Sequence, residues 1–452
     1  MLDQTVVAVA LDPMARALHL TTFTMHSVVL VYVLSLSSLT PVGGMLARRI
    51  GLVRTFQWGV VTFVLASASC GLAPAGGAAE AFILTARCVQ GAGAALMLPV
   101  ATTMITDLYT EEERGRALAI YAGLAQIFFV FGPLIGAVLA ESFGWRAVFL
   151  VNVPLSGVIL WLAAQAHMRN TAAGGSLSVG HVLAMAFALA MLVLGLYGWG
   201  IWGFADLRSF AALMTGAAAL VFAVRLTLRS AHPVVDLRLL AIRRYAVAVT
   251  LTFSVQAAQM IVLVHGAVFL RQSLNLSLLA SGLCLLPLVI SLTAGTFASG
   301  YLLDSFKSVR VPALCGLVAA TVGTTAWTAA LSAHDYLWQI PGMVLAGVGL
   351  GLPIPALSAE LMGVVPRDKT ADASVLRQML RQLGGAFGLA VAGGVVLAVN
   401  DDRLDVAGVV NVPAARAGFV LASGLAAGTL VFAVFALRGP STSQPGGAPD
   451  GT

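Results

Sequence analysis

Charge is scarce in this chain. Only 10% of its 452 residues are charged and 59% are hydrophobic, whereas a soluble domain carries about 25% charged residues. A soluble core cannot bury so much apolar surface, so we expect the chain to lie in a membrane. The net charge of +6 is then explained by Lys and Arg in the loops on one side. No basic face of a soluble domain is visible, which argues against a nucleic-acid partner.

Several chemical motifs are also missing. The four cysteines form no Cys-x-x-Cys pair and fall in apolar stretches, so we interpret them as packing residues and expect no metal site. No phosphate-binding loop of the Gly-x-x-x-x-Gly-Lys-Ser/Thr type occurs, which excludes nucleotide hydrolysis as a driving force. Asp401, Asp402 and Asp405 form an Asp-Asp-x-x-Asp pattern like that of membrane prenyltransferases, but the second Asp-rich cluster of such enzymes is absent.

The chain does contain a long series of apolar stretches. Backbone groups in lipid must pair within one segment, so these stretches predict helices, and the alternation typical of a membrane barrel is missing. Fourteen spans are predicted, at about 1–12, 25–46, 56–73, 80–104, 117–140, 147–166, 179–199, 209–228, 245–268, 278–302, 311–331, 339–363, 375–398 and 413–437.

The distribution of basic residues predicts the orientation of these spans. With the N-terminus in the cytoplasm, 18 of the 25 basic residues fall in cytoplasmic segments. One more, Arg87, lies inside a span, and the other six are external: Arg16, Arg146, Arg208, Arg271, Arg403 and Arg416. Positively charged residues collect on the cytoplasmic side, so we expect both termini in the cytoplasm.

The run from Gly123 to Pro154 carries a resemblance to a known family. It contains Gly132-Pro133-x-x-Gly136, then Gly144-Trp145-Arg146 and Asn152-x-Pro154. These elements resemble the fifth span, external turn and sixth span of the drug:proton antiporter-2 family, the 14-span EmrB/QacA subfamily of the major facilitator superfamily. The resemblance implies an all-α polytopic membrane protein with the major facilitator fold, in which two six-helix bundles flank two central linker helices.

On this basis the chain divides into four parts. An N-terminal six-helix bundle would cover 1–166, two linker helices 167–230, a cytoplasmic connector and C-terminal bundle 231–437, and a disordered cytoplasmic tail 438–452. The first span is apparently truncated, because only two residues precede Asp3 and a span needs about 20. We expect the true start of translation to lie upstream.

Asp3 and Arg87 are the expected proton-coupling pair. The segments around them resemble the first-span and fourth-span motifs of the family. Counting 1.5 Å per residue from the outer ends places Asp3 about 13 Å deep and Arg87 about 12 Å deep, and a buried Arg requires a partner. A neighbouring guanidinium favours the carboxylate form of Asp3, while burial disfavours it. Displacement of Arg87 by substrate would then favour protonation; a purely structural ion pair is the alternative.

Further residues are assigned through the resemblance. Gly132, Pro133 and Gly136 form the antiporter motif, and we expect their small side chains to let spans 5 and 10 press together as a seal. Gly44, Arg48 and Gly51 form a gating loop after span 2, and Gly300 and Asp304 repeat it after span 10. The family usually has an acid where Arg48 stands, so we expect part of the gating to depend on Asp304.

Polar residues inside the spans are candidates for substrate binding. We assign this role to Gln90, Gln256 and Gln259, because amides at the membrane midplane are costly unless they face a cavity or a partner helix. For Gln256 and Gln259, hydrogen bonding between helices is an equal alternative. Arg377 and Arg381 share one helical face and are expected to anchor the cytoplasmic end of span 13.

The resemblance implies a function as well. We expect a proton-coupled antiporter that exports lipophilic drugs or antibiotics across the cytoplasmic (inner) membrane by alternating access. Its partners would be small lipophilic substrates, protons and the lipid bilayer; it would be a monomer without a cofactor, driven by the proton gradient, and not an enzyme. The alternatives are a dedicated exporter of one endogenous metabolite or amino acid on the same scaffold, or a prenyltransferase-like membrane enzyme.

Overall fold

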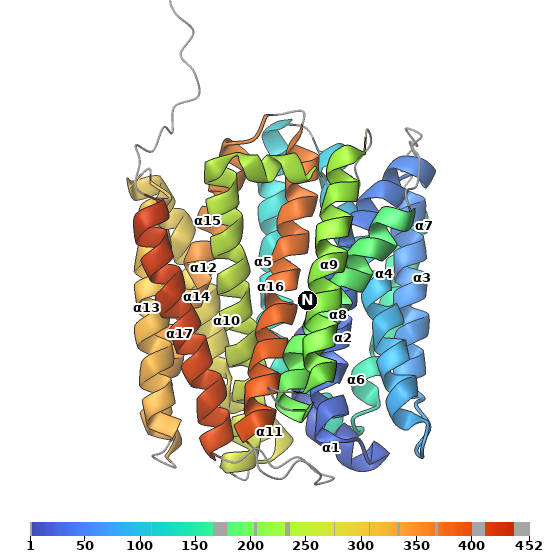
Figure 1. Ribbon diagram of the computed structural model, residues 1–452, viewed down its shortest axis with the longest axis vertical. Coiled ribbons are helices and arrows are strands. Elements are labelled where there is room, and N and C mark those ends of the chain that lie inside the picture. Colours follow the sequence, from blue (N-terminus) through green and yellow to red (C-terminus); the bar gives the residue numbers. More distant parts are fainter. Residues whose placement is uncertain are drawn as a thin grey trace, which may run out of the picture.

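The architecture is helical throughout the part of the chain that the structure describes. A computed structural model describes residues 2–109, 111–165, 179–202, 206–230, 236–274, 276–306, 308–331, 335–366, 369–399 and 412–437. The predicted tail 438–452 and the acidic segment from Asp401 to Asp405 lie outside these residues. Most of the helices run along the long axis of the molecule (Figure 1).

The helices follow the predicted spans closely. They are α1 (Leu2–Leu18), α2 (Thr22–Ile50), α3 (Leu52–Gly71), α4 (Ala79–Leu108), α5 (Glu111–Ser142), α6 (Ala147–Leu150), α7 (Asn152–Gln165), α8 (Val179–Trp202), α9 (Leu207–Arg229), the short 3-10 helix η1 (Leu237–Ala241), α10 (Arg243–Ser273), α11 (Leu278–Cys284), α12 (Leu286–Phe306), α13 (Arg310–Ala330), α14 (Tyr336–Gly351), α15 (Pro353–Gly363), α16 (Thr370–Val399) and α17 (Val412–Ala436).

Length and composition make this a multi-span membrane protein. Nine helical stretches among the described residues are long and apolar enough to cross a bilayer, and three shorter apolar helices add to them. Four ends differ from the prediction by five or six residues: α5 begins at Glu111, before the predicted 117, and α10 ends at Ser273, beyond the predicted 268. Helix α1 continues to Leu18, six residues beyond its predicted end, and α16 begins at Thr370, five residues before its predicted start.

Three predicted spans are each divided into two helices. The divisions fall at Val151, Leu285 and Leu352, and each is followed within three residues by a proline: Pro154, Pro287 and Pro353. Proline has no N–H to donate and its ring crowds the preceding turn, so it favours the first turn of a new helix. The divisions therefore follow from the sequence, although hydropathy alone did not reveal them.

In Figure 1, α3, α4 and α7 lie on the right and α13, α14 and α17 on the left, with α5 and α16 near the middle and α8 and α9 between the two groups. Helix α8 packs on both α2 and α16. The hydroxyl of Tyr197 on α8 donates to the carbonyl of Phe23 on α2 at 3.1 Å, and its ring lies against Gly393 of α16. The pair α8–α9 thus covers the seam between the two groups of helices.

Candidate functional site

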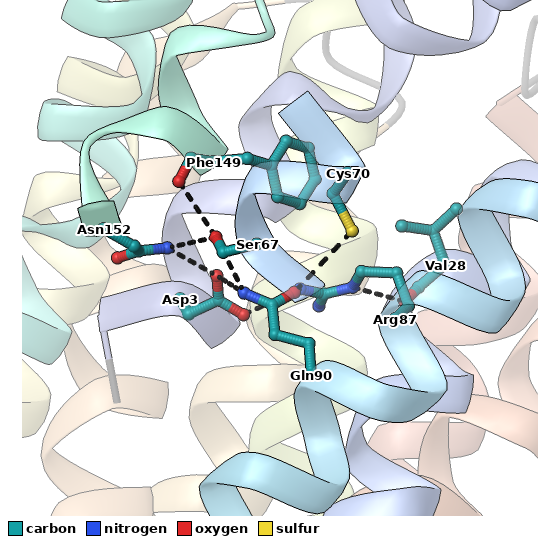
Figure 2. A network of polar contacts seen from close by, with 8 residues as sticks. All are labelled: Asp3, Val28, Ser67, Cys70, Arg87, Gln90, Phe149 and Asn152. Atoms are coloured by element: carbon teal, nitrogen blue, oxygen red, sulfur yellow. Dashed lines mark hydrogen bonds and ion pairs between the residues drawn. The ribbon is translucent and has the colours of Figure 1, made fainter. Parts of the chain in front are cut away.

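A buried ion pair joins α1 to α4. The guanidinium of Arg87 lies 2.7 Å from a carboxylate oxygen of Asp3, and the side chains are 0% and 6% exposed. Figure 2 shows the two pointing toward each other from separate helices. The structure thus brings together the two charges that the depth count placed at one level, because α1 and α4 run along the same axis with the same rise per residue.

Amide side chains complete the surroundings of Asp3. Gln90 accepts from Arg87 at 2.7 Å and donates to Asp3 at 3.0 Å. Asn152 donates to Asp3 at 3.3 Å and to the hydroxyl of Ser67 at 2.9 Å, and Ser67 donates to the carbonyl of Phe149 at 2.9 Å. We call Asp3, Ser67, Arg87, Gln90 and Asn152 the carboxylate network (Figure 2).

Arg87 is held on three sides besides its contacts with the network. Its Nε donates to the carbonyl of Val28 at 3.0 Å. The guanidinium carbon lies 4.3 Å from the centre of the Tyr32 ring and 5.8 Å from that of Phe149, distances at which the ring face attracts a cation. The orientation of Arg87 is therefore fixed by neighbours from α2, α4 and α6.

The position of Gln90 differs from the expected one. We assigned it to substrate binding, but the side chain is fully buried and both ends of its amide are used inside the carboxylate network. One helical turn separates Gln90 from Arg87, so residues at i and i+3 share a face. Gln90 therefore contacts both Asp3 and Arg87.

The antiporter motif packs against α1. A Cβ added at Gly136 would lie 2.6 Å from the carbonyl oxygen of Val6, and one added at Gly132 would collide with the hydroxyl of Thr5. The expected partner of these glycines was span 10, and that expectation is wrong for both of them. Their lack of side chains lets α5 press on α1 two and three residues from Asp3.

Pro133 lies at a contact with span 10, the contact that we expect for all three residues of the antiporter motif. A Cβ added at Gly282 of α11 would lie 3.0 Å from the carbonyl oxygen of Pro133 and 3.0 Å from the Cβ of Ala137. Helix α11 is the first part of the divided span 10. One face of α5 thus packs on α1 and the adjacent face on α11, as small residues allow in helix packing within membranes.

A second ion pair links α1 to α10 at the lower end of Figure 1. Arg271 lies 2.8 Å from a carboxylate oxygen of Asp12, and Arg16 lies 3.4 Å from the same oxygen. A cavity of about 10 Å³ lies beside this pair, lined among others by Ala8, Val268 and Ser281. A cavity of that size holds about one water at most.

A third pair links α2 to α16 at the upper end. Arg48 lies 3.4 Å from Asp372, with side chains 48% and 40% exposed. Arg48 stands where the family usually has an acid, and here it contacts an acid of the other group of helices. Gly44 lies beside Val375 of α16, and Gly51 adopts a φ of 94° where α2 ends. Gly300 has no close neighbour, and the side chain of Asp304 lies outside the described part.

The amides of α10 meet a basic residue of α16. Gln256 accepts from Arg381 at 3.0 Å; Gln259 is 5% exposed. We expect Arg381 to anchor the cytoplasmic end of its span. Helix α16 starts at Thr370, so Arg381 lies about 16 Å from the start of the helix, and its place relative to the membrane stays a prediction.

Asp12, Ser67 and Tyr32 were not singled out from the sequence. Ser67 and Tyr32 each lie in an apolar span that holds several other hydroxyl side chains, so the sequence does not distinguish them from packing residues. The pairing of Asp12 with Arg271 could have been predicted from the sequence. Both residues lie near the outer ends of their predicted spans, and they have opposite charges. Among the described residues, no group of three His, Cys, Asp or Glu side chains could hold a metal ion.

Comparison with known proteins agrees with this architecture. The family model described as "Major Facilitator Superfamily" matches residues 1–389. The chain is 28% identical to "Multidrug resistance protein Stp" of Mycobacterium tuberculosis over 88% of this chain and 73% of that protein. It is 28% identical to "Methylenomycin A resistance protein" of Streptomyces coelicolor over 88% of this chain and 83% of that protein. It is 29% identical to "Tetracenomycin C resistance and export protein" of Streptomyces glaucescens over 87% of this chain and 72% of that protein.

A solved structure has the same fold. A crystal structure of an auto-inhibited peptide transporter of the POT family superimposes with a TM-score of 0.65 at 14% identity, over 98% of this chain and 97% of that one.

Proposed function

Because the chain belongs to the Major Facilitator Superfamily, we propose that it is a proton-coupled antiporter that exports lipophilic drugs or antibiotics. It is a transporter and not an enzyme, and its relatives confer multidrug or antibiotic resistance. The carboxylate network is the observation that carries the proton coupling. A carboxylate buried in a membrane helix beside an Arg and two amides is the arrangement expected of a proton relay.

Helix α1 transmits the change in charge. Protonation of Asp3 removes the negative charge that Arg87 faces at 2.7 Å, so the contact between α1 and α4 weakens. The same helix carries Asp12, nine residues further on, which pairs with Arg271 of α10. A small movement of α1 therefore reaches the opposite group of helices at the lower end.

Alternating access follows from the two ion pairs across the seam. Asp12–Arg271 closes the lower end and Arg48–Asp372 closes the upper end. Opening one pair while the other stays closed exposes the interior to one side of the membrane at a time. Repeated halves around a midplane site are a common construction of secondary transporters.

The proposal includes the membrane topology. Fourteen spans, with α6–α7, α11–α12 and α14–α15 each counted as one, give two six-helix bundles joined by α8 and α9. The upper end faces the cytoplasm of a bacterial inner membrane, because most of the basic residues fall at that end of the predicted spans.

Transport by everted, acid-loaded membrane vesicles tests the function. Addition of an exported compound should release protons from wild-type vesicles, and Asp3→Asn should abolish the release while the protein remains in the membrane. Asp402→Asn removes a carboxylate outside the network and should behave as wild type. Proton release that persists in Asp3→Asn would contradict the role of Asp3, and substrate export without proton movement in wild type would contradict antiport.

A further inference from the structure

Two arginines of α16 lie between helices without an acidic partner. Arg377 and Arg381 are partly buried, and Arg381 lies about 16 Å along the helix from Thr370. Among the side chains that the structure describes, the ion pairs found involve other basic residues, and Arg377 donates to the hydroxyl of Ser358 on α15 at 3.4 Å. A charge buried between membrane helices is costly unless something of opposite sign compensates it.

Buried polar atoms around these arginines also lack partners. Gln382 is 1% exposed, and neither atom of its amide has a hydrogen-bond partner among the described residues. The same holds for Oε1 of Gln259 and Nε of Arg377. Buried polar groups are nearly always hydrogen-bonded, so the unsatisfied amide of Gln382 and Nε of Arg377, five residues apart on α16, are available to a ligand.

These groups meet at the seam between the two halves. A Cβ added at Gly385 of α16 would lie 3.6 Å from Cγ of Gln256 and 3.8 Å from Val33 of α2. Gln382 precedes Gly385 by three residues and shares its face of the helix. Arg381 donates to Gln256 at 3.0 Å from the adjacent position. The arginine site, defined as Gln256, Arg377, Arg381 and Gln382, therefore lies along α16 where this helix packs against α10 and α2, and Arg377 at its end donates to Ser358 of α15.

From these observations we infer that the arginine site binds an anionic group of the transported compound, with a carboxylate as its chemical class. The inference rests on the proposed function and names its substrate chemistry. A guanidinium presents donors in a planar fork that matches a carboxylate. Arg381 would exchange its neutral acceptor, Gln256, for the carboxylate, while Gln256 and Gln382 would bind the neutral polar part. Arg377 adds positive charge one turn away.

The test is calorimetric binding to the purified full chain in nanodiscs of phosphatidylcholine alone. The probes are matched pairs that differ only in charge: 1-naphthaleneacetate and its amide, ibuprofen and its amide, and 2-naphthoate and its amide. Wild type should bind at least one acid tenfold or more tightly than its amide, since hydrogen bonds to charged groups are about twice as strong as neutral ones.

Variants separate recognition from folding. Arg381→Gln should lose the preference for the acid, Arg381→Lys should keep part of it, and Arg416→Gln, a change at an exposed arginine of α17, should keep all of it. Asp3→Asn should bind the acid normally even though it no longer couples protons, which distinguishes this inference from the proposed coupling.

Equal binding of acid and amide in all three pairs, or an unchanged preference in Arg381→Gln, would overturn the inference.

Discussion

Arg87 holds a positive charge where its side chain has no exposed surface. Replacing a buried ion pair as a whole can be neutral, but removal of one partner leaves the other charge uncompensated and costs about 3–5 kcal/mol. Asp3 is the only carboxylate within 4 Å of Arg87 among the described residues. The stability of the protein therefore depends on the two charges being present together.

Removal of Arg87 alone should destabilise the protein more than removal of the pair. We expect Arg87→Leu to lower the free energy of unfolding by about 3–5 kcal/mol, and Asp3→Asn combined with Arg87→Leu to recover a large part of that loss. Thermal unfolding of detergent-solubilised protein measures both. A double variant as unstable as Arg87→Leu would show that the charge of Asp3 is not what Arg87 compensates.

The pairing of Asp3 with Arg87 could be predicted because helix rise is constant, so depth can be counted from a span end. The contacts of Gln90 could not be predicted, because an amide serves a buried network and a substrate site equally well. The start of α16 could not be predicted for a third reason. Hydropathy does not mark the polar first turns of this helix, which begins five residues before the predicted span.

At the scale of the helix, the contact between α5 and α1 fixes where Asp3 lies. Gly132 and Gly136 bring the α5 backbone against Thr5 and Val6. A motif of small residues predicts that two helices approach closely, but it does not identify which neighbour they approach. Here the two glycines of α5 pack against α1, whereas Pro133 and Ala137 pack against α11. One segment of α5 thus contacts two neighbouring helices.

A methyl group at this contact should be harmful. Gly136→Ala places a Cβ 2.6 Å from the carbonyl of Val6 and should cost about 1–3 kcal/mol of stability, as overpacking does, together with loss of proton-coupled export. Gly157→Ala is the matched control, because its added Cβ meets no atom within 4 Å. Thermal unfolding and vesicle transport are the measurements, and equal behaviour of the two variants would contradict a close packing role for Gly136.

For the whole molecule, the described ion pairs across the seam favour a form closed at both ends. Arg48–Asp372 is half exposed, and such pairs contribute about 0.2–1 kcal/mol. That energy changes a population by at most about fivefold. An exposed pair can thus bias the upper end without locking it, as a transporter that must open and close requires.

Charge reversal at the upper end tests this bias. Arg48→Asp should repel Asp372 and increase the open population at that end up to about fivefold, and Arg48→Asp with Asp372→Arg should return it toward wild type. Spin labels at positions 54 and 310, at the upper ends of α3 and α13, would report the separation of the halves by pulsed electron resonance in a cysteine-free background. A distance distribution that does not change in Arg48→Asp would exclude a gating role for the pair.

The carboxylate network uses side chains from the first 152 residues, whereas the arginine site lies on α10 and α16. A proton on Asp3 and a substrate at the arginine site would not compete for the same side chain, so both can be bound to the protein at once. Steady-state kinetics should then be of the mixed type: raising the proton concentration should change the maximal export rate as well as the half-saturating substrate concentration. Strictly competitive kinetics would require the two cargoes to share a residue.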